Sequence, residues 1–264
     1  MLTAAKDAPT RLAVTLSRNA SLKAHARAEA VAERCGADFY PKRPALEALF
    51  EKYDFLYMLR NGREELVNRD GTSLFVHAAM LRSKIKAGRD HPFLRAFWPR
   101  DKIAPTSVVD TTLGLCTDAL HLAGATGAKV VGLETSPIIY SLAEEGIARL
   151  REDRYPQVAR AARLVTPLLV DHRDWLFAQA PRSVDVLFVH PMFENPPSGG
   201  ASFDLFRAFA DPHPVPAAAL TAMGKIARHH VGFKLRAGWR TEPAGLCWHR
   251  REEGARTDLL VHDV

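Results

Sequence analysis

The stretch that decides the fold runs from residue 107 to residue 137 and reads SVVDTTLGLCTDALHLAGATGAKVVGLETSP. Two short apolar runs, at 107–110 and 129–134, are typical of buried strands, and the segment between them has the apolar spacing of a helix. Strands that alternate with helices predict a mostly parallel sheet that binds ligands at the carboxyl ends of its strands. We therefore expect an α/β, Rossmann-like domain over residues 105–264. Further apolar runs lie at 168–170, 184–189 and 231–235, and Leu246–Trp248 with Leu259–Val261 are candidates for a closing antiparallel pair.

The turn after the first of these strands carries a candidate ligand site. Gly114 lets a ligand approach the backbone, and Glu134, 20 residues further on at the end of the next strand, can bind ribose hydroxyls. The turn differs from the phosphate-binding G-x-G-x-x-G motif, because it has one glycine and carries Asp110 beside it. A carboxylate there repels a pyrophosphate and attracts an ammonium or sulfonium group. This charge favours S-adenosylmethionine over NAD as the ligand, with a purely structural turn as the alternative.

A second candidate site follows the apolar run VDVLFV at 184–189. His190, Pro191, Met192 and Phe193 come directly after it, in the order polar, proline, apolar, aromatic. This order resembles the Asp/Asn-Pro-Pro-Tyr/Phe element of methyltransferases that modify exocyclic amines of bases. In that element the first side chain and the next backbone carbonyl accept hydrogen bonds from the amine, and the aromatic ring stacks on the base. By this resemblance, residues 190–193 are the predicted catalytic residues.

Together these segments resemble a known superfamily over nearly the entire chain, from Arg11 to Leu260. VVDTTLGLCTDA, VGLETSP, the EEG of the following helix and HPMF are similar to class I S-adenosylmethionine-dependent methyltransferases. The related members are the bacterial enzymes that methylate the guanine exocyclic amine in small-subunit ribosomal RNA. FVHAAMLRSKIK and MFENPPSGGASFDLFRAFAD are shared with a further bacterial branch of that superfamily. The resemblance implies methyl transfer from S-adenosylmethionine to a base amine in RNA. With Asp110 and Gly114 of the turn, the implied cofactor pocket contains Thr117, Asp118, Glu134, Thr135, Asp171, His172 and His190.

The chain departs from the family pattern at two positions. The second turn glycine of the family is Cys116 here, whose side chain would crowd the methionine end of the cofactor. The family aspartate before the proline is His190, and a histidine accepts a hydrogen bond only through one nitrogen of its neutral form. These departures leave two alternatives beside an RNA methyltransferase. One is a small-molecule methyltransferase, and the other is a non-catalytic RNA-binding or scaffold protein that has lost the aspartate.

Residues 1–104 are predicted to form a separate, small α+β lobe. A strand at 11–16, a helix at 22–35 that stops at Gly36, and short strands separated by Asn61-Gly62 and Asp70-Gly71 indicate a lobe that ends in a β-meander. Its last part is a basic connector with interleaved aromatic residues. Either this connector is solvated and its rings pack on the neighbouring domain, or its cations contact RNA phosphates. The residues of this predicted basic patch are Arg82, Lys84, Lys86 and Arg89.

The 264-residue composition is that of a globular protein, with 47% hydrophobic and 25% charged residues. The net charge of +6 favours a polyanionic partner only slightly. Three cysteines without a CxxC pair, and His229-His230 without a third spaced ligand, argue against a disulfide framework and a metal site. The N-terminal apolar run of five residues is too short for a signal peptide or a membrane span. We therefore expect a soluble, cytoplasmic protein that uses no metal. Lys234, in the apolar run VGFKLR, is expected to face solvent or to contact a phosphate at the rim of the site.

Overall fold

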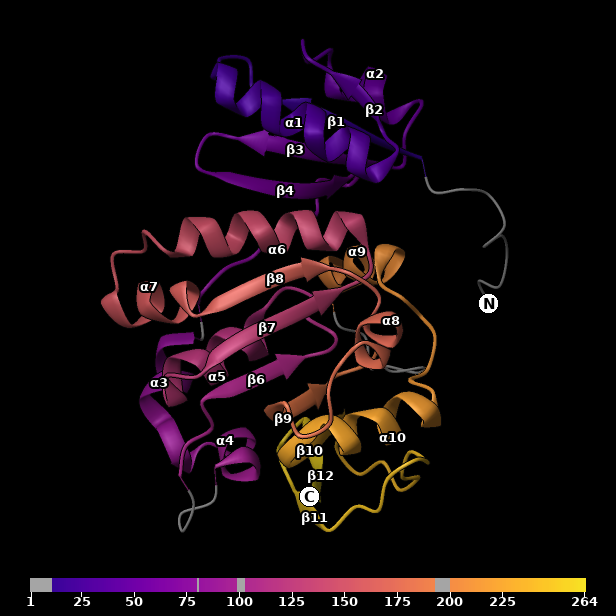
Figure 1. The fold of residues 1–264 in the computed structure, drawn as a ribbon. Helices are drawn as coiled ribbons and strands as arrows, with labels where there is room; N and C mark the ends of the chain where they lie inside the picture. The colour runs from indigo at the N-terminus through magenta and orange to yellow at the C-terminus, as the bar shows by residue number, and fades with distance from the viewer. Residues whose placement is uncertain (1–10, 80, 99–102, 193–199) are drawn as a thin grey trace. The chain divides into compact units, whose positions relative to one another are not determined.

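The computed structural model describes residues 11–79, 81–98, 103–192 and 200–264 (Figure 1). The chain divides into two compact units. The first contains residues up to 75 together with 199–209, and the second contains 76–198 and 210–264. Each unit has its own sheet and its own apolar core.

The first unit is a five-stranded sheet in the order β2-β1-β3-β4-β5. Strand β1 is parallel to β2 and β3, and β3, β4 and β5 form an antiparallel meander with Gly62 and Gly71 at the two turns. Helix α9 returns to this unit late in the chain, where Phe209 packs edge-on against Phe55 at 5.0 Å. The elements are β1 (Leu12–Leu16), α1 (Leu22–Cys35), β2 (Asp38–Tyr40), α2 (Leu46–Phe50), β3 (Phe55–Arg60), β4 (Arg63–Asn68), β5 (Ser73–Leu74) and α9 (Ala201–Phe209).

The second unit is a seven-stranded sheet in the order β11-β12-β10-β9-β6-β7-β8. Strands β8, β7, β6, β9 and β10 are all parallel, and in Figure 1 the arrows of β6, β7 and β8 point the same way. Strand β12 is antiparallel to both β10 and β11. The chain starts at β6, builds outward to β8 on one side, and then returns to β9 and β10 on the other. The order therefore reverses between β6 and β9, which is where open α/β sheets bind their ligands.

The elements of this unit follow one another along the chain. They are α3 (Leu81–Ala87), the 3-10 turn η1 (Gly88–Asp90), α4 (Pro92–Phe97), β6 (Ser107–Asp110), α5 (Thr117–Thr126), β7 (Lys129–Glu134), α6 (Pro137–Leu150), α7 (Pro156–Arg163), β8 (Val165–Leu169), α8 (His172–Phe177), β9 (Val184–Val189), α10 (Ala217–Ile226), β10 (Ala227–Arg236), β11 (Arg250–Glu252) and β12 (Thr257–Asp263).

Helices cover both faces of the second sheet, as its strand sequences require. Val108 faces a core made with α3 to α7, whereas its neighbour Val109 faces a core made with α8 and α10. Successive strand residues point to opposite faces, so a strand that is buried on both faces has an apolar run in place of an alternating pattern. All six residues of β9 are buried, including Asp185 at its start. The predicted α/β, Rossmann-like fold with a mostly parallel sheet and an antiparallel closing strand is confirmed.

The structure differs from the predicted fold in two details, the closing strand pair and the boundary between the two units. The closing pair is formed by β11 and β12, and Leu246–Trp248 lies in the loop before β11. The units also divide at residue 75 and not near 104. The reason is that α4 buries Phe93 and Phe97 against Phe188 of β9, with ring centroids 5.1 and 5.7 Å apart. The segment read as a connector is thus a helical part of the second unit, and the prediction that its aromatic rings pack on the following domain is confirmed.

Across the residues that the structure describes, no helix is long and apolar enough to cross a membrane. The same residues contain no group of three or more His, Cys, Asp or Glu side chains that could hold a metal ion.

Candidate active site

The turn that follows β6 forms the floor of the candidate site. Thr111 donates its backbone N–H to the Phe188 carbonyl at 2.8 Å, so the turn is held against β9. Gly114 has φ +53°, a left-handed conformation that glycine adopts without a steric penalty. Cys116 has φ +55° and is fully buried in the core that the sheet shares with α5 and α6. A left-handed backbone favours glycine, the residue that the resemblance led us to expect at this position. The buried side chain means that the expected crowding of the ligand by Cys116 is wrong.

Glu134, at the end of β7, ties the two loops of the site together. Its Oε2 accepts the Gly114 N–H at 3.0 Å, and its Oε1 accepts the Ser136 N–H at 2.9 Å. The side chain is 8% exposed, and burial raises the carboxyl pKa, against the opposing effect of these backbone hydrogen bonds. Ser136 in turn caps α6, with Pro137 at the first helical position. Glu134 therefore lies at the carboxyl ends of β6 and β7, as predicted, and it also holds the turn in shape.

Three charged or titratable side chains from different elements meet beside the end of β9. Asp118, in the first turn of α5, accepts a hydrogen bond from His190 Nδ1 at 3.1 Å. The same oxygen, Oδ2, accepts one from Nζ of Lys234 on β10 at 2.7 Å. The Asp118 and Lys234 side chains are only 13% and 15% exposed. Thr112 completes the arrangement, because its hydroxyl accepts the His190 backbone N–H at 2.7 Å.

The pKa shifts in this cluster show which groups carry charge. Burial opposes ionisation of Asp118, but the Lys234 charge and the His190 hydrogen bond outweigh it and hold the Asp118 pKa well below its usual value. Burial and the Lys234 charge lower the pKa of His190, although Asp118 acts in the opposite direction. At neutral pH the cluster therefore contains a carboxylate, an ammonium group and a neutral imidazole. An ionised Asp118 accepts the proton on Nδ1, so Nε2 of the neutral ring carries the lone pair.

Asp110 lies beneath this cluster and is 1% exposed. Burial raises its pKa to about 7, and the charge of Asp118 adds to the effect. Its Oδ1 accepts the Thr112 N–H at 3.1 Å, which acts in the opposite direction. Asp110 is thus poised between its neutral and ionised forms near neutral pH.

The remaining predicted pocket residues lie at the same edge of the sheet. Thr117 opens α5 and Thr135 follows β7, and both are exposed. Asp171 caps α8 by accepting the Arg173 N–H at 2.8 Å, and its pKa is lowered to about 2, chiefly by the side chain of Arg173. His172 is mostly buried, and its Nε2 has no hydrogen-bond partner within the described part of the chain. Burial lowers the pKa of His172 and keeps the ring neutral.

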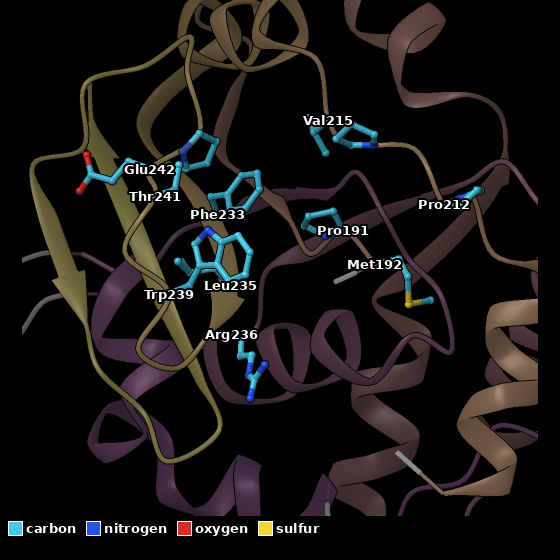
Figure 2. A pocket seen from close by; sticks show the side chains of 12 residues that line it. Pro191, Met192, Pro212, Val215, Phe233, Leu235, Arg236, Trp239, Thr241 and Glu242 are labelled. Carbon is cyan, nitrogen blue, oxygen red and sulfur yellow. The ribbon is translucent and has the colours of Figure 1, made fainter. Parts of the chain in front are cut away.

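An apolar pocket of about 210 Å³ lies at the ends of β9 and β10 (Figure 2). In Figure 2 the rings of Phe233 and Trp239 lie next to each other on one side, and Pro191 and Met192 lie on another. Phe193, the predicted stacking residue, lies outside the described residues. The lining residues are Pro191, Met192, Pro212, Pro214, Val215, Phe233, Leu235, Arg236, Trp239, Thr241, Glu242 and Pro243.

The predicted basic patch lies on α3 and η1. The Arg82 guanidinium is 3.6 Å from the centroid of the Tyr155 ring, and that of Arg89 is 3.8 Å from the Trp98 ring. The backbone carbonyl of Lys84 lies 3.1 Å from Nε2 of the buried His121. Lys86 is exposed.

With this geometry established, comparison with known proteins gives the family. Residues 53–199, more than half of the chain, match the model of a family described as "Putative SAM-dependent methyltransferase". The chain belongs to this family. S-adenosylmethionine is therefore the methyl donor of this methyltransferase.

Individual relatives agree with the family. The chain is 33% identical over 132 residues to ribosomal RNA small subunit methyltransferase J of Laribacter hongkongensis, which covers 50% of this chain and 46% of the relative. It is 30% identical over 190 residues to the protein of the same name from Hahella chejuensis, covering 68% and 70%. A solved SAM-dependent methyltransferase from Neisseria gonorrhoeae has the same fold, with a TM-score of 0.67, 15% identity and 95% of both chains covered. The match to the first relative thus spans about half of that protein's length.

The residues of the methyltransferase fit the chemistry of this cofactor. A ribose diol would need hydrogen-bond acceptors and the cationic amino acid end would need a negative charge, and the carboxyl groups of Glu134 and Asp118 at this edge of the sheet have these properties. The unpartnered Nε2 of His172 is a buried polar atom that an adenine amino group or ring nitrogen would satisfy.

Lys234 is the site residue that the sequence reasoning misplaced. It is mostly buried and paired with Asp118, where a solvent-facing or rim position was expected. Strand β10 alternates, so Phe233 and Leu235 face the apolar pocket while Lys234 faces Phe93 on the other side, 5.4 Å from its ring centroid. A lysine inside an otherwise apolar strand, next to the strand that ends at His190, is the signal that could have found it.

Proposed function

We propose that this methyltransferase modifies an exocyclic amine of a nucleobase in ribosomal RNA, and that His190 accepts a hydrogen bond from that amine. The observation that carries the proposal is the pairing of His190 Nδ1 with an ionised Asp118 at 3.1 Å, at the end of β9. The relatives named ribosomal RNA small subunit methyltransferase J support RNA as the acceptor.

The pairing gives His190 the role that the family aspartate has. Asp118 orients the imidazole and fixes its proton on Nδ1, which leaves Nε2 as the hydrogen-bond acceptor. The low pKa of His190 keeps the ring in its neutral, accepting form at physiological pH. By the same resemblance, the backbone carbonyl that follows His190 would be the second acceptor on this loop. The proton that the amine loses on methylation has Nε2 as its nearest base, or it passes to water.

The apolar pocket is the proposed site of the acceptor base. Pro191, which directly follows His190 in the chain, lines this pocket. Phe233 and Trp239 supply flat aromatic surfaces, and stacking on such rings is how proteins hold an unpaired RNA base (Figure 2). Met192, together with these rings, would exclude water from the reacting amine.

On the cofactor side, S-adenosylmethionine supplies a methyl group that its sulfonium already activates, so the chain needs only to bind and orient. We assign the ribose hydroxyls to Glu134 and the methionine end to Asp110 and Asp118. Gly114 allows close approach of the backbone. Thr117, Thr135, Asp171 and His172 complete the pocket, with the last two beside the adenine.

The basic residues Arg82, Lys84, Lys86 and Arg89 are part of this proposal as contacts for RNA phosphates. Phosphate contacts make affinity depend steeply on salt, so RNA binding by this enzyme should weaken as ionic strength rises. Ribosomal RNA is modified where ribosomes are assembled, which makes the cytoplasmic location expected from the sequence part of the same proposal.

The test is tritium-methyl transfer from S-adenosylmethionine to small-subunit ribosomal RNA and, separately, to free nucleosides. His190→Ala should lose rate but keep cofactor affinity within a few-fold, and His190→Asp should keep or raise transfer. Wild-type cofactor binding without any transfer, restored by His190→Asp alone, would mean that the chain has become a non-catalytic RNA-binding or scaffold protein. Transfer to nucleosides but not to RNA would point to the small-molecule alternative.

A further inference from the structure

A second feature of the methyltransferase unit lies on the helices that cover one face of its sheet. Helices α3 and α7 pack together there, and basic residues lie along both. We call this feature the α3–α7 surface. Its residues are Arg82, Lys84, Lys86, Arg151, Arg154, Arg160 and Arg163.

Within the described part of the unit, the basic residues of the α3–α7 surface have no carboxylate partner, as is also true of the exposed Arg182, Arg240 and Arg256, whereas several other arginines are paired. Arg95, Arg149, Arg173 and Arg228 each form a salt bridge with a carboxylate, and Arg250 does so too. Among the described residues, none of the seven basic side chains of the α3–α7 surface forms a salt bridge. Cations that are not neutralised within the chain are available to an anionic partner.

This surface also holds most of the net charge of the chain. Residues 81–90 contain four basic and one acidic residue, and residues 151–163 contain four basic and two acidic residues. These two short segments thus contribute five of the six net positive charges. Such a concentration attracts polyanions over several ångströms at physiological salt.

Helix packing and ring stacking determine where the cations of this surface lie. Helix α7 buries only Val158 and three alanines against the core, so it lies close to the sheet and its arginines stand out from it. Arg160 and Arg163 are exposed on the outer side of that helix. At its start, the Tyr155 ring has the Arg82 guanidinium on it at 3.6 Å and that of Arg154 at 4.7 Å. A guanidinium held flat on a ring still has N–H donors at its edge, which suit the oxygens of a phosphate.

We infer that the α3–α7 surface binds the phosphate backbone of the RNA substrate. This inference rests on the proposed function, since it takes RNA as the acceptor. It extends the four-residue patch expected from the sequence to α7 and to the stacked Arg82, Tyr155 and Arg154. Contacts of this kind carry no base specificity, so they fix the position of the RNA and leave base selection to the pocket.

The experiment compares the double variant R154Q/R160Q with a matched control, K225Q/R256Q. The control removes two exposed cations from elsewhere on the same unit, one of them on α10, which covers the opposite face of the sheet. The probe is a fluorescent RNA hairpin with a duplex stem of about 16 base pairs, the length that double-stranded RNA-binding domains cover. Its affinity is measured without cofactor over a series of salt concentrations. Cofactor binding is measured for every variant by calorimetry.

Each phosphate contact changes the slope of log affinity against log salt by about 0.9 for a duplex. At 0.1 M salt, compared with 1 M, one contact is therefore worth about eightfold in affinity. R154Q/R160Q should therefore reduce the slope by almost two and the affinity by tenfold or more, whereas the control stays near the wild type. Equal losses in both variants, or no loss in either, would overturn the inference. Binding to anionic lipid vesicles is measured for the same variants. If R154Q/R160Q weakens binding to the vesicles and leaves RNA binding unchanged, the inference is also overturned, because the surface would then bind membranes. If the wild-type protein does not bind S-adenosylmethionine, the proposed function is overturned. The RNA affinities of the variants would still test the α3–α7 surface as an RNA-binding surface.

Discussion

Replacing Lys234 with methionine should raise the pKa of His190 and move the acid limb of the activity profile to higher pH. Lys234 and His190 share one partner, the Oδ2 oxygen of Asp118, at 2.7 and 3.1 Å. In the wild type, burial, Lys234 and, more weakly, Lys84 all disfavour the imidazolium, and Asp118 favours it. Methionine keeps the length and apolar stem of lysine, so the variant removes the charge with little change in packing.

The size of the effect follows from the geometry. Because both nitrogens contact the same oxygen, they lie at most about 5.8 Å apart. At an effective dielectric constant of about 20, two unit charges at that distance repel by about 3 kcal/mol, so removing the Lys234 charge should raise the pKa of His190 measurably. Without Lys234, Asp118 still attracts the imidazolium. The variant should therefore be partly protonated, and slower, at a pH where the wild-type histidine is neutral.

Two measurements check this prediction. The first follows the ring nitrogens of His190 by NMR as a function of pH, which needs no acceptor. The second follows kcat against pH for methyl transfer to RNA. Lys225→Met, an exposed lysine on α10, is the matched control and should shift neither profile. An unchanged or lower pKa of His190 in Lys234→Met would refute the electrostatic reasoning, whatever the effect on rate.

Three further predictions follow. Glu134→Gln should weaken S-adenosylmethionine binding by about 1–3 kcal/mol, the usual cost of removing a charged hydrogen bond, and an unchanged Kd by calorimetry would exclude Glu134 from the pocket. Asp110 has a pKa of about 7 and should ionise when the cationic cofactor binds. Calorimetry near pH 7, repeated in buffers of different ionisation enthalpy, should detect the released proton. Asp110→Asn should abolish this proton release. His121 is buried and its pKa is lowered, chiefly by burial, to about 3, so the unfolded chain takes up a proton first and stability falls as pH drops from about 6.5 towards 3. His121→Phe should flatten that acid loss, which is worth about 3 kcal/mol at pH 4, in urea unfolding at pH 4 to 7. The same change at the partly exposed His25 should not.

The fold of the methyltransferase unit could be predicted because its signals are local. The apolar runs 107–110 and 129–134 form strands β6 and β7 in parallel register, and Ser136 with Pro137 starts α6. Gly36 ends α1 in a left-handed conformation, as the sequence indicates. Such signals act between neighbours in the chain, through periodicity, capping and backbone conformation, so a single sequence contains them. The position of Glu134 at the ligand edge follows from the same periodicity.

The charge state of the site is decided only by the tertiary structure. Lys234 and Asp118 are 116 positions apart, and their pairing depends on β10 lying beside β9 with α5 packed across that face. Whether His190 is neutral, and which nitrogen holds its proton, depends on that pair and on burial. The same holds for the pKa of Asp110, for the buried direction of the Cys116 side chain and for the division of the chain at residue 75. Each of these depends on desolvation and on contacts between distant segments, which residue order alone does not specify.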